Sequence, residues 1–382
     1  MIQINDKKDC CGCSACTNIC PKKCITMHPD NEGFLYPKIC KDICVDCGLC
    51  EIVCPVINQN NARKPLYVYA AKNKNDGIRM QSSSGGVFTL LAEEIINAGG
   101  VVFGAKYDKN WNVVHSWTDT IEGIVDFRGS KYVQSIIGNT YSEVKTFLQE
   151  NRKVLFSGTP CQIAGLKKFL RKEYENLLTV DIICHGVPSP MIWAEYLKFV
   201  TPDRRNIIQI TMREKSCSWR RSKMIIKNGE EYLYNGDSYE NIYMKGFLSG
   251  LYLRPSCHSC KFKNGRSNSD ITIGDCWGIE QISSEFDDDK GISLIMLHSS
   301  RIINSLTDLE MLKKEISFEE GIAKNHAYIN PTIEKQYRKD FWILYHKRGF
   351  IAVSSFINRQ QGFIMRIKRK VRKILNLKFD TL

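Results

Sequence analysis

The chain has 382 residues, of which 43% are hydrophobic and 25% charged, and its formal net charge is +13. This length exceeds that of small disulfide-stapled domains and allows one large core plus a smaller module. No stretch reaches the ~18 apolar residues of a membrane helix, and the first residues lack the apolar core of a signal peptide. We therefore expect a cytoplasmic protein with reduced thiols, and nothing in the composition indicates a nucleic-acid partner.

The cysteines are concentrated at the start of the chain, where 11 of the 17 precede residue 55. Two runs have the spacing C-x2-C-x2-C-x3-C followed by proline, and each is the run of bacterial two-cluster ferredoxins, whose fourth cysteine binds the other cluster. We predict two [4Fe–4S] clusters. The first is held by Cys10, Cys13, Cys16 and Cys54, and the second by Cys44, Cys47, Cys50 and Cys20.

The segment between the runs predicts a hairpin, with two short apolar pieces around the turn signal Asp30 to Gly33. Residues 1–60 thus form a ferredoxin-like domain. Zinc is the alternative, but zinc sites usually pair two C-x2-C steps across a longer spacer. Cys11, Cys24 and Cys40 fall outside the spacing and are interpreted as packing thiols near the clusters, and a ligand in an alternative register is the other interpretation.

A polar linker, Ile57 to Leu66, leads to a second region in which strands and helices alternate. Expected strands include 66–72, 101–107, 153–158, 177–184, 207–214, 222–229, 270–275 and 291–298, and expected helices 87–98, 140–151 and 160–174. This alternation predicts an α/β domain with some parallel sheet and an antiparallel part, so the whole chain is α+β or α/β. We place this domain at 66–345, in two parts, 66–150 and 151–345.

Two loops in this domain suit an anionic cofactor. Ser82 to Gly86 precedes a helix, whose N-terminal N–H groups suit phosphate or an electron-rich ring. Arg128 to Ser135 adds small residues, the cation Lys131 and the aromatic Tyr132. A flavin needs such groups for its pyrophosphate and its ring. An ordinary helix N-cap and a solvated lysine are the structural alternative.

Six cysteines follow residue 60, and four of them are candidates for a third cluster. Strand ends and helix starts meet at one edge of an α/β sheet, and a C-x2-C pair follows later in the chain. We predict a third [4Fe–4S] cluster on Cys161, Cys184, Cys257 and Cys260, with Cys276 as a substitute ligand. Zinc is the open alternative there. Cys217 is expected to be a buried, inert thiol, and His258 to face solvent.

A series of stretches, in order from about residue 67 to 300, resembles the family of coenzyme F420 hydrogenase/dehydrogenase beta subunits, in the form with an N-terminal dicluster ferredoxin domain. They are "SSSGGVFTLLAEEI", "GGVVFGAKY", "RGSKYVQS", "VLFSGTPCQIAGLKKFL", "VDIICHGVPSP", "LYLRPSCHSCKF" and "RSNSDITIGDCWGIE". The resemblance implies FAD, bound through Ser83, Ser84, Gly85, Gly86, Gly129, Ser130, Lys131 and Tyr132. It also implies the additional cluster. Asp270, Asp275 and Trp277 belong to its last signature and are expected to line the site, with an ordinary strand-end turn and a core tryptophan as the alternative.

Two basic segments have competing interpretations. Met212 to Lys223 resembles a family patch that would receive an anionic substrate, whereas a solvated basic hairpin is the simpler interpretation. Residues 346–382 form a basic amphipathic tail with Phe363, Ile367, Val371 and Ile374 at helical spacing. Such a helix either packs on the domain or lies at the inner membrane face as a peripheral anchor.

Together these features predict a flavin-dependent iron–sulfur oxidoreductase. It would pass electrons between a ferredoxin-type carrier and a two-electron small-molecule partner through [4Fe–4S] clusters and FAD. The alternatives are an electron-transfer subunit that serves a partner enzyme, for example in polysaccharide biosynthesis, and a zinc-binding scaffold. No catalytic acid or base is predicted.

Overall fold

The structure is a computed structural model that describes the backbone of residues 1–302 and 309–374, and side chains as far as residue 359 except that of residue 302. Its N-terminal module contains α1 (Ala15–Ile19), β1 (Ile25–Pro29), β2 (Leu35–Ile39) and α2 (Leu49–Ile52). The predicted hairpin is confirmed, because β1 and β2 pair antiparallel. Asp30 shapes its turn by accepting hydrogen bonds from the N–H groups of Glu32 and Phe34 at 3.0 and 2.9 Å.

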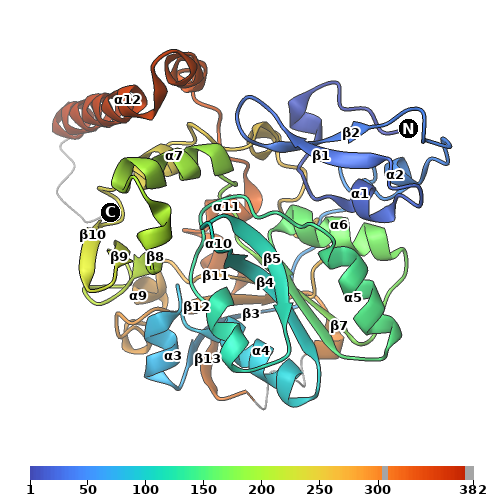
Figure 1. The fold of residues 1–382 in the computed structure, drawn as a ribbon. Coiled ribbons are helices and arrows are strands. Elements are labelled where there is room, and N and C mark those ends of the chain that lie inside the picture. Colours follow the sequence, from blue (N-terminus) through green and yellow to red (C-terminus); the bar gives the residue numbers. More distant parts are fainter. Residues whose placement is uncertain (303–308, 375–382) are drawn as a thin grey trace.

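The larger region is built on a mixed eight-stranded sheet with the order β13-β3-β12-β11-β7-β6-β4-β5 (Figure 1). The central strands β11, β7, β6 and β4 run parallel, and the strands on both sides are antiparallel. The mixed α/β fold is therefore confirmed. The strands are β3 (Tyr67–Asn73), β4 (Val101–Tyr107), β5 (Val113–Thr118), β6 (Val154–Gly158), β7 (Leu177–Ile182), β11 (Ile271–Asp275), β12 (Ser293–Leu297) and β13 (Met311–Glu315).

Each face of this sheet buries its own set of apolar side chains. Alternation along β4 and β6 sends Phe103 and Phe156 to one face and Val102 and Leu155 to the other. The first face packs against α5 (Thr140–Gln149) and α6 (Pro160–Leu170), and the second against α4 (Val87–Asn97). The three helices that the sequence predicts here are all present.

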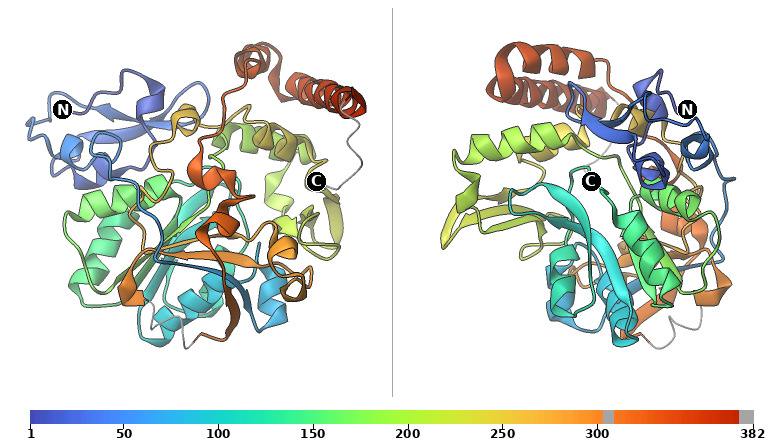
Figure 2. Two further views of the ribbon diagram at one scale, coloured as in Figure 1. Left: turned by 180° about the vertical axis from the view of Figure 1, so that it is seen from behind. Right: turned by 45° about the vertical axis from the view of Figure 1, so that its right-hand side comes forward.

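The N-terminal module lies against α6 (Figures 1 and 2). Gly165 of α6 allows this approach, because a Cβ there would lie only 2.8 Å from the Cβ of Cys13. Buried thiols of the module share one apolar core with α5 and α6. Arg338 adds an ion pair with Glu32. The module is thus packed on the larger region rather than attached only through its linker.

A smaller layer lies beside the large sheet and contributes Arg213 to the lining of the cavity described below. It contains the antiparallel strands β8 (Gln209–Glu214), β9 (Lys223–Asn228) and β10 (Glu231–Asp237). It also contains α7 (Pro190–Val200), α8 (Ile242–Leu248) and the start of α12 (Arg338–Ile374), which is broken at Gly349. Aromatic side chains of α7, α8 and α12 form its core. The sequence prediction did not include β5, β10, β13, α7 or α8.

Short helices complete the chain: α3 (Asp76–Gln81), α9 (Ile279–Ile282), α10 (Phe318–Ile322) and α11 (His326–Ile329). The helical spacing predicted for Phe363, Ile367, Val371 and Ile374 concerns side chains outside the described residues. Within the part of the chain that is described, no helix combines the length and apolar character that crossing a bilayer requires.

Candidate functional site

Two cavities in the N-terminal module are lined by the cysteines of the two runs. The outer cysteine cavity is surrounded by Cys20, Cys44, Cys47 and Cys50, with Cys24 beside them. The inner cysteine cavity is surrounded by Cys10, Cys13, Cys16 and Cys54, with Cys11 beside them. These are the two predicted ligand sets, each with its fourth cysteine from the other run. The exchange occurs because α1 and α2 bring the ends of the two runs together.

A third cysteine cavity lies where the module meets the larger region. It is lined by Cys161, Cys184, Cys257 and Cys260, the four predicted residues, and also by Cys11. Cys161 lies in the first turn of α6 and Cys184 follows β7, so both come from the same edge of the sheet. Cys257 lies in a short 3-10 helix, Pro255–Ser259. Nothing in the sequence spacing of Cys161 and Cys184 indicates this meeting, which depends on the parallel strand order.

The donor set and its surroundings fit iron–sulfur clusters. Burial and then neighbouring thiols raise the pKa of Cys16 to about 12, so its thiolate is unfavourable there without a cation. Backbone N–H groups point to sulfur, from Ile2 to Cys50 Sγ at 3.3 Å and from Val187 to Cys257 Sγ at 3.4 Å. Such hydrogen bonds to sulfur are typical of cluster sites. Among the described residues no three cysteine, histidine or acidic side chains are grouped to hold a single metal ion.

Three expectations about side chains outside these sets are wrong. Cys217 is exposed rather than buried. Cys276 is buried among apolar side chains next to Trp219 and does not line the third cysteine cavity. His258 does not face solvent, because its Nδ1 lies 2.9 Å from the Thr332 carbonyl oxygen and its Nε2 is buried.

The central cavity, of about 310 Å³, lies at the carboxyl ends of the parallel strands of the large sheet, and Arg213 of β8 is part of its lining. Seven of the eight residues predicted for FAD line it: Ser83, Ser84, Gly86, Gly129, Ser130, Lys131 and Tyr132. The two predicted loops meet there, and the hydroxyl oxygens of Ser83 and Ser130 are 2.7 Å apart. Gly85 lies behind the wall, where its N–H donates to Ser293 Oγ at 2.9 Å.

Several residues that the sequence prediction did not include line the same cavity. His115 of β5 contacts Ser135 Oγ through Nδ1 at 2.9 Å and the Ser157 carbonyl through Nε2 at 3.0 Å. Burial lowers the pKa of His115 to about 4, so the ring is neutral and Nε2–H donates to the carbonyl. Gln162 Nε2 donates to Ser135 Oγ at 2.9 Å. The strand β5 was not predicted, which is why His115 was missed.

Met212 to Lys223 is not a solvated basic hairpin. Arg213 lines the central cavity and pairs with Asp275, Nη1 to Oδ2, at 2.7 Å, and its side chain is only 10% exposed. Trp219 is fully buried and stacks on Trp277 with ring centroids 4.8 Å apart. Asp275 and Trp277 therefore meet this segment. Asp270 lies elsewhere, where its Oδ2 accepts a hydrogen bond from the N–H of Thr179.

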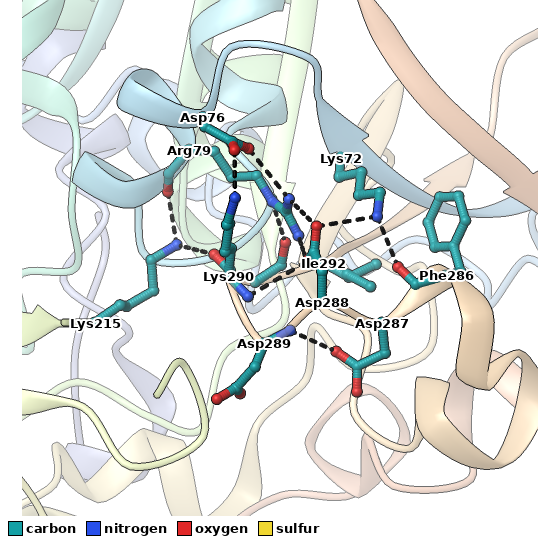
Figure 3. Close-up of polar contacts among 12 residues, drawn as sticks. Lys72, Asp76, Arg79, Lys215, Phe286, Asp287, Asp288, Asp289, Lys290 and Ile292 are labelled. Carbon is teal, nitrogen blue, oxygen red and sulfur yellow. Dashed lines mark hydrogen bonds and ion pairs between the residues drawn. The ribbon is translucent and has the colours of Figure 1, made fainter. Parts of the chain in front are cut away.

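Lys215 holds the serine–glycine loop, Ser82 to Gly86, through its contact with Ser84, and it also contacts Arg79 and Lys290 (Figure 3). Its ammonium donates to the carbonyl oxygens of Arg79, Ser84 and Lys290 at 2.6, 2.8 and 2.8 Å. Three acceptors match the three N–H donors of a charged lysine. Burial lowers the pKa of Lys215 to about 7, while the three carbonyls favour the charged form. The loop around Asp288 is held in turn by Arg79 and Lys72.

The four cavities are neighbours in a row. Cys50 of the outer cysteine cavity accepts a hydrogen bond from the N–H of Ile2, which lines the inner one. Cys11 and Val56 line both the inner and the third cysteine cavities. Val187 lines both the third cysteine cavity and the central cavity. The arrangement therefore connects the exposed side of the module with the polar cavity.

Two models of one protein family match most of the larger region. Residues 68–139 match the N-terminal model of the coenzyme F420 hydrogenase/dehydrogenase beta subunit, and residues 151–320 match its C-terminal model. The chain belongs to this family. One relative is a subunit of the F(420)H(2) dehydrogenase of Methanosarcina mazei, which is 23% identical over 66% of this chain and 71% of that protein.

A second relative is the coenzyme F420-dependent sulfite reductase of Methanocaldococcus jannaschii. It is 24% identical over 86% of this chain, and the chain spans about half (53%) of its length. A solved structure, the F420-reducing [NiFe] hydrogenase complex of Methanosarcina barkeri, contains a chain that aligns with a TM-score of 0.47 and 18% identity, over 69% of this chain and 91% of that one. The family assignment places the protein among the iron–sulfur electron-transfer oxidoreductases.

Proposed function

We propose that the protein is an iron–sulfur flavoprotein that exchanges electrons between an external one-electron carrier and a two-electron small-molecule partner. The observation that carries this proposal is the row of four neighbouring cavities, three lined by cysteines and one by polar residues. When bound, the [4Fe–4S] clusters would carry single electrons, and FAD would combine them into a two-electron transfer.

The residues of the chain have distinct tasks in this proposal. The two cysteine runs hold the first and second clusters, and Cys161, Cys184, Cys257 and Cys260 hold the third. The serine–glycine loop and Gly129 to Tyr132 bind the flavin, with Lys131 as the cation beside its anionic groups. Val187 and the first turn of α6 separate the third cysteine cavity from the flavin. Cys47 is exposed, so the external carrier would meet the protein at the outer cysteine cavity.

Arg213 and Asp275 also line the central cavity, and in this proposal a substrate would reach the flavin beside them. The two relatives described above act with coenzyme F420 by name, and an F420-type partner is one candidate for the two-electron exchange. The direction of electron flow depends on the reduction potentials of the carrier and the partner. It is therefore set by which carrier and partner are supplied, and not by the fold.

A subunit that serves a partner enzyme is the second candidate function. The relative from Methanosarcina mazei is a subunit by name, which favours it. Both candidates predict bound clusters and flavin. They differ in turnover, because an isolated subunit without its own substrate site would reduce no small-molecule acceptor.

The test begins with anaerobic purification, followed by iron, sulfide and flavin analysis. The purified protein is then mixed with reduced ferredoxin in a stopped-flow instrument, and cluster and flavin absorbance are followed separately. We expect cluster reduction to precede flavin reduction. The Cys184→Ser/Cys260→Ser variant should retain cluster reduction but lose rapid flavin reduction, whereas Cys217→Ser should behave as the wild type. A colourless, zinc-containing wild type would overturn the proposal.

A further inference from the structure

Arg254 is a buried cation without a carboxylate partner in the described part of the chain. Its side chain has 0% exposure. Nε donates to the Cys10 carbonyl at 2.7 Å, Nη1 to Gln134 Oε1 at 3.0 Å and Nη2 to the Leu35 carbonyl at 2.9 Å. Nη2 also lies 3.5 Å from Cys10 Sγ. The hydrogen-bonding groups are satisfied, but the charge is not neutralised by any of these partners.

Lys263 is a second cation of this kind, beside the third cysteine cavity. It is 6% exposed, and its ammonium donates to the carbonyl oxygens of Cys184 and Ala327 at 2.5 and 2.6 Å. It lines the cavity directly. No ion pair joins it to a carboxylate among the residues that the structure covers. Two of its three N–H donors are used by carbonyls, which leaves one for a ligand in the cavity.

The other buried cations have negative charge nearby. Arg79 pairs with Asp288, Arg213 with Asp275 and Arg338 with Glu32. Lys215 has carbonyl partners only, and burial together with the neighbouring Arg213 and Arg79 lowers its pKa to about 7, against the attraction of Asp275 and Asp288. Transfer of an ion from water to a protein interior costs several kcal/mol even after relaxation. Arg254 and Lys263 lie at cysteine cavities without an ion-pair partner, so the missing negative charge is expected there.

We propose that Arg254 and Lys263 balance the negative charge of the first and third iron–sulfur clusters and raise their reduction potentials. This inference rests on the proposed function. Four thiolates around a cluster leave a net negative charge, and each added electron increases it. A cation a few ångströms away therefore stabilises the reduced state more than the oxidised state, because Coulomb attraction is strong where water is excluded. Arg254 acts at Cys10 and Lys263 at Cys184.

The inference is tested on the full chain with its clusters, by redox titration followed by electron paramagnetic resonance. Arg254→Met should lower the midpoint potential of the first cluster, and Lys263→Met that of the third. We expect at least a tenfold change in each reduction equilibrium, which is about 59 mV for a one-electron couple. Lys263→Met should leave the first cluster unchanged, so the two variants control each other. The Cys184→Ser/Cys260→Ser variant assigns the signals.

A matched control uses the second arginine that joins the module to the larger region. Arg338 donates to the carbonyl of Leu253, next to Arg254 in the sequence, but has its carboxylate partner Glu32. The double variant Glu32→Gln/Arg338→Met removes a neutral pair and should leave both potentials in place, although it removes a contact of the same interface. Arg254→Lys, which keeps the charge, should restore most of the potential.

Iron content and thermal unfolding are measured for each variant. These measurements distinguish the effect of the lost charge from a loss of the folded structure. If Arg254→Met does not fold, Lys263→Met still decides the matter at the third cluster. Unmoved potentials in iron-replete Lys263→Met and Arg254→Met would overturn the inference while leaving the proposed function intact. A shift of the same size in the Glu32→Gln/Arg338→Met control would also overturn it, since a neutral change would then suffice. A wild type without iron would instead overturn the proposed function.

Discussion

The cysteine cavities and the central cavity are built in opposite ways. The inner and outer cysteine cavities take their thiols from two short runs within the first 54 residues. The central cavity takes its lining from loops and strand ends spread between Ser82 and Ser293. The first kind of site depends on local spacing, whereas the second depends on how precisely the fold holds separate backbones together. The third cysteine cavity combines both, with a C-x2-C pair and two isolated cysteines.

The largest expected effect comes from removing ligands of the third cysteine cavity. Cys184→Ser/Cys260→Ser should lose about a third of the bound iron, because one of three [4Fe–4S] clusters cannot be held by the remaining thiolates. Iron and sulfide assay of anaerobically purified protein measures this directly. The clusters of the N-terminal module should keep their spectra, since their ligands lie in separate cavities.

Cys217→Ser is the control for that variant. Cys217 is exposed and lines none of the four cavities, so its replacement should change neither iron content nor spectra. Full iron in the double variant would show that the third cavity holds no cluster. Zinc in the wild-type protein at that position would have the same consequence.

Backbone placement should matter most at the central cavity, where Gly85 is held between β3 and β12. A Cβ there would lie 2.4 Å from the Ala71 carbonyl oxygen and 2.6 Å from the Ser293 nitrogen, both backbone atoms. Overpacking of this kind costs about 1–3 kcal/mol. Gly85→Ala should therefore displace the serine–glycine loop and weaken flavin binding at least tenfold, measured by fluorescence titration of the flavin-free protein.

Gly129 is the comparison for Gly85, because its backbone conformation, and not a close neighbour, restricts substitution. Nothing lies within 4 Å of a Cβ added there, but its φ is +77°. Alanine in this conformation costs about 1–2 kcal/mol, and asparagine tolerates it better. Gly129→Ala should weaken flavin binding less than Gly85→Ala, and Gly129→Asn less again. Equal effects of all three variants would mean that these loops do not position the flavin.

The difference between the two kinds of site also explains what the sequence could predict. The cysteine runs specify their own pairing, because the ferredoxin spacing includes the exchange of the fourth ligand. The central strands and the helices α4, α5 and α6 follow from apolar periodicity and glycine stops. The meeting of Cys161, Cys184 and the C-x2-C pair was predicted from the general rule that strand ends gather at one sheet edge.

Other parts of the site lack such a signal. His115 lies on β5, a short antiparallel edge strand whose alternation is weak. The segment from Met212 to Lys223 reads as polar, yet Arg213 and Lys215 are buried, because carboxylate and carbonyl groups from distant segments satisfy them. Cys217 was expected to be buried because free cysteines usually are. Partners that lie 60 or more residues apart in the sequence, such as Asp275 for Arg213, follow only from the tertiary structure.

A smaller effect is expected from pH at the central cavity. Burial lowers the pKa of Lys131 from 10.5 to about 8, and Asp126 opposes this shift. Below pH 8 the side chain is charged and attracts an anionic cofactor. Above pH 8 binding must first restore its proton, so flavin affinity should fall by up to tenfold for each further pH unit. Titrations between pH 7 and 9.5 measure this.

Lys131→Met should bind flavin more weakly at pH 7 and lose this pH dependence. Lys106→Met is the control, since Lys106 pairs with Asp126 at 3.4 Å and does not line the cavity. If Lys131→Met shows the same pH profile as the wild type, the pH dependence of flavin binding belongs to another group.

The smallest effects are expected at the thiols that lie beside the predicted ligand sets. Cys24 Sγ is 3.4 Å from Cys20 Sγ, and Cys11 lines two cavities, yet neither fits the ferredoxin spacing. Cys24→Ser and Cys11→Ser should retain all iron, because four thiolates remain at each cavity. Loss of a third of the iron in Cys11→Ser, with full iron in Cys161→Ser, would instead make Cys11 the fourth ligand of the third cluster. The third site would then be closed by the N-terminal module itself, and its cluster could form only after the module packs on α6.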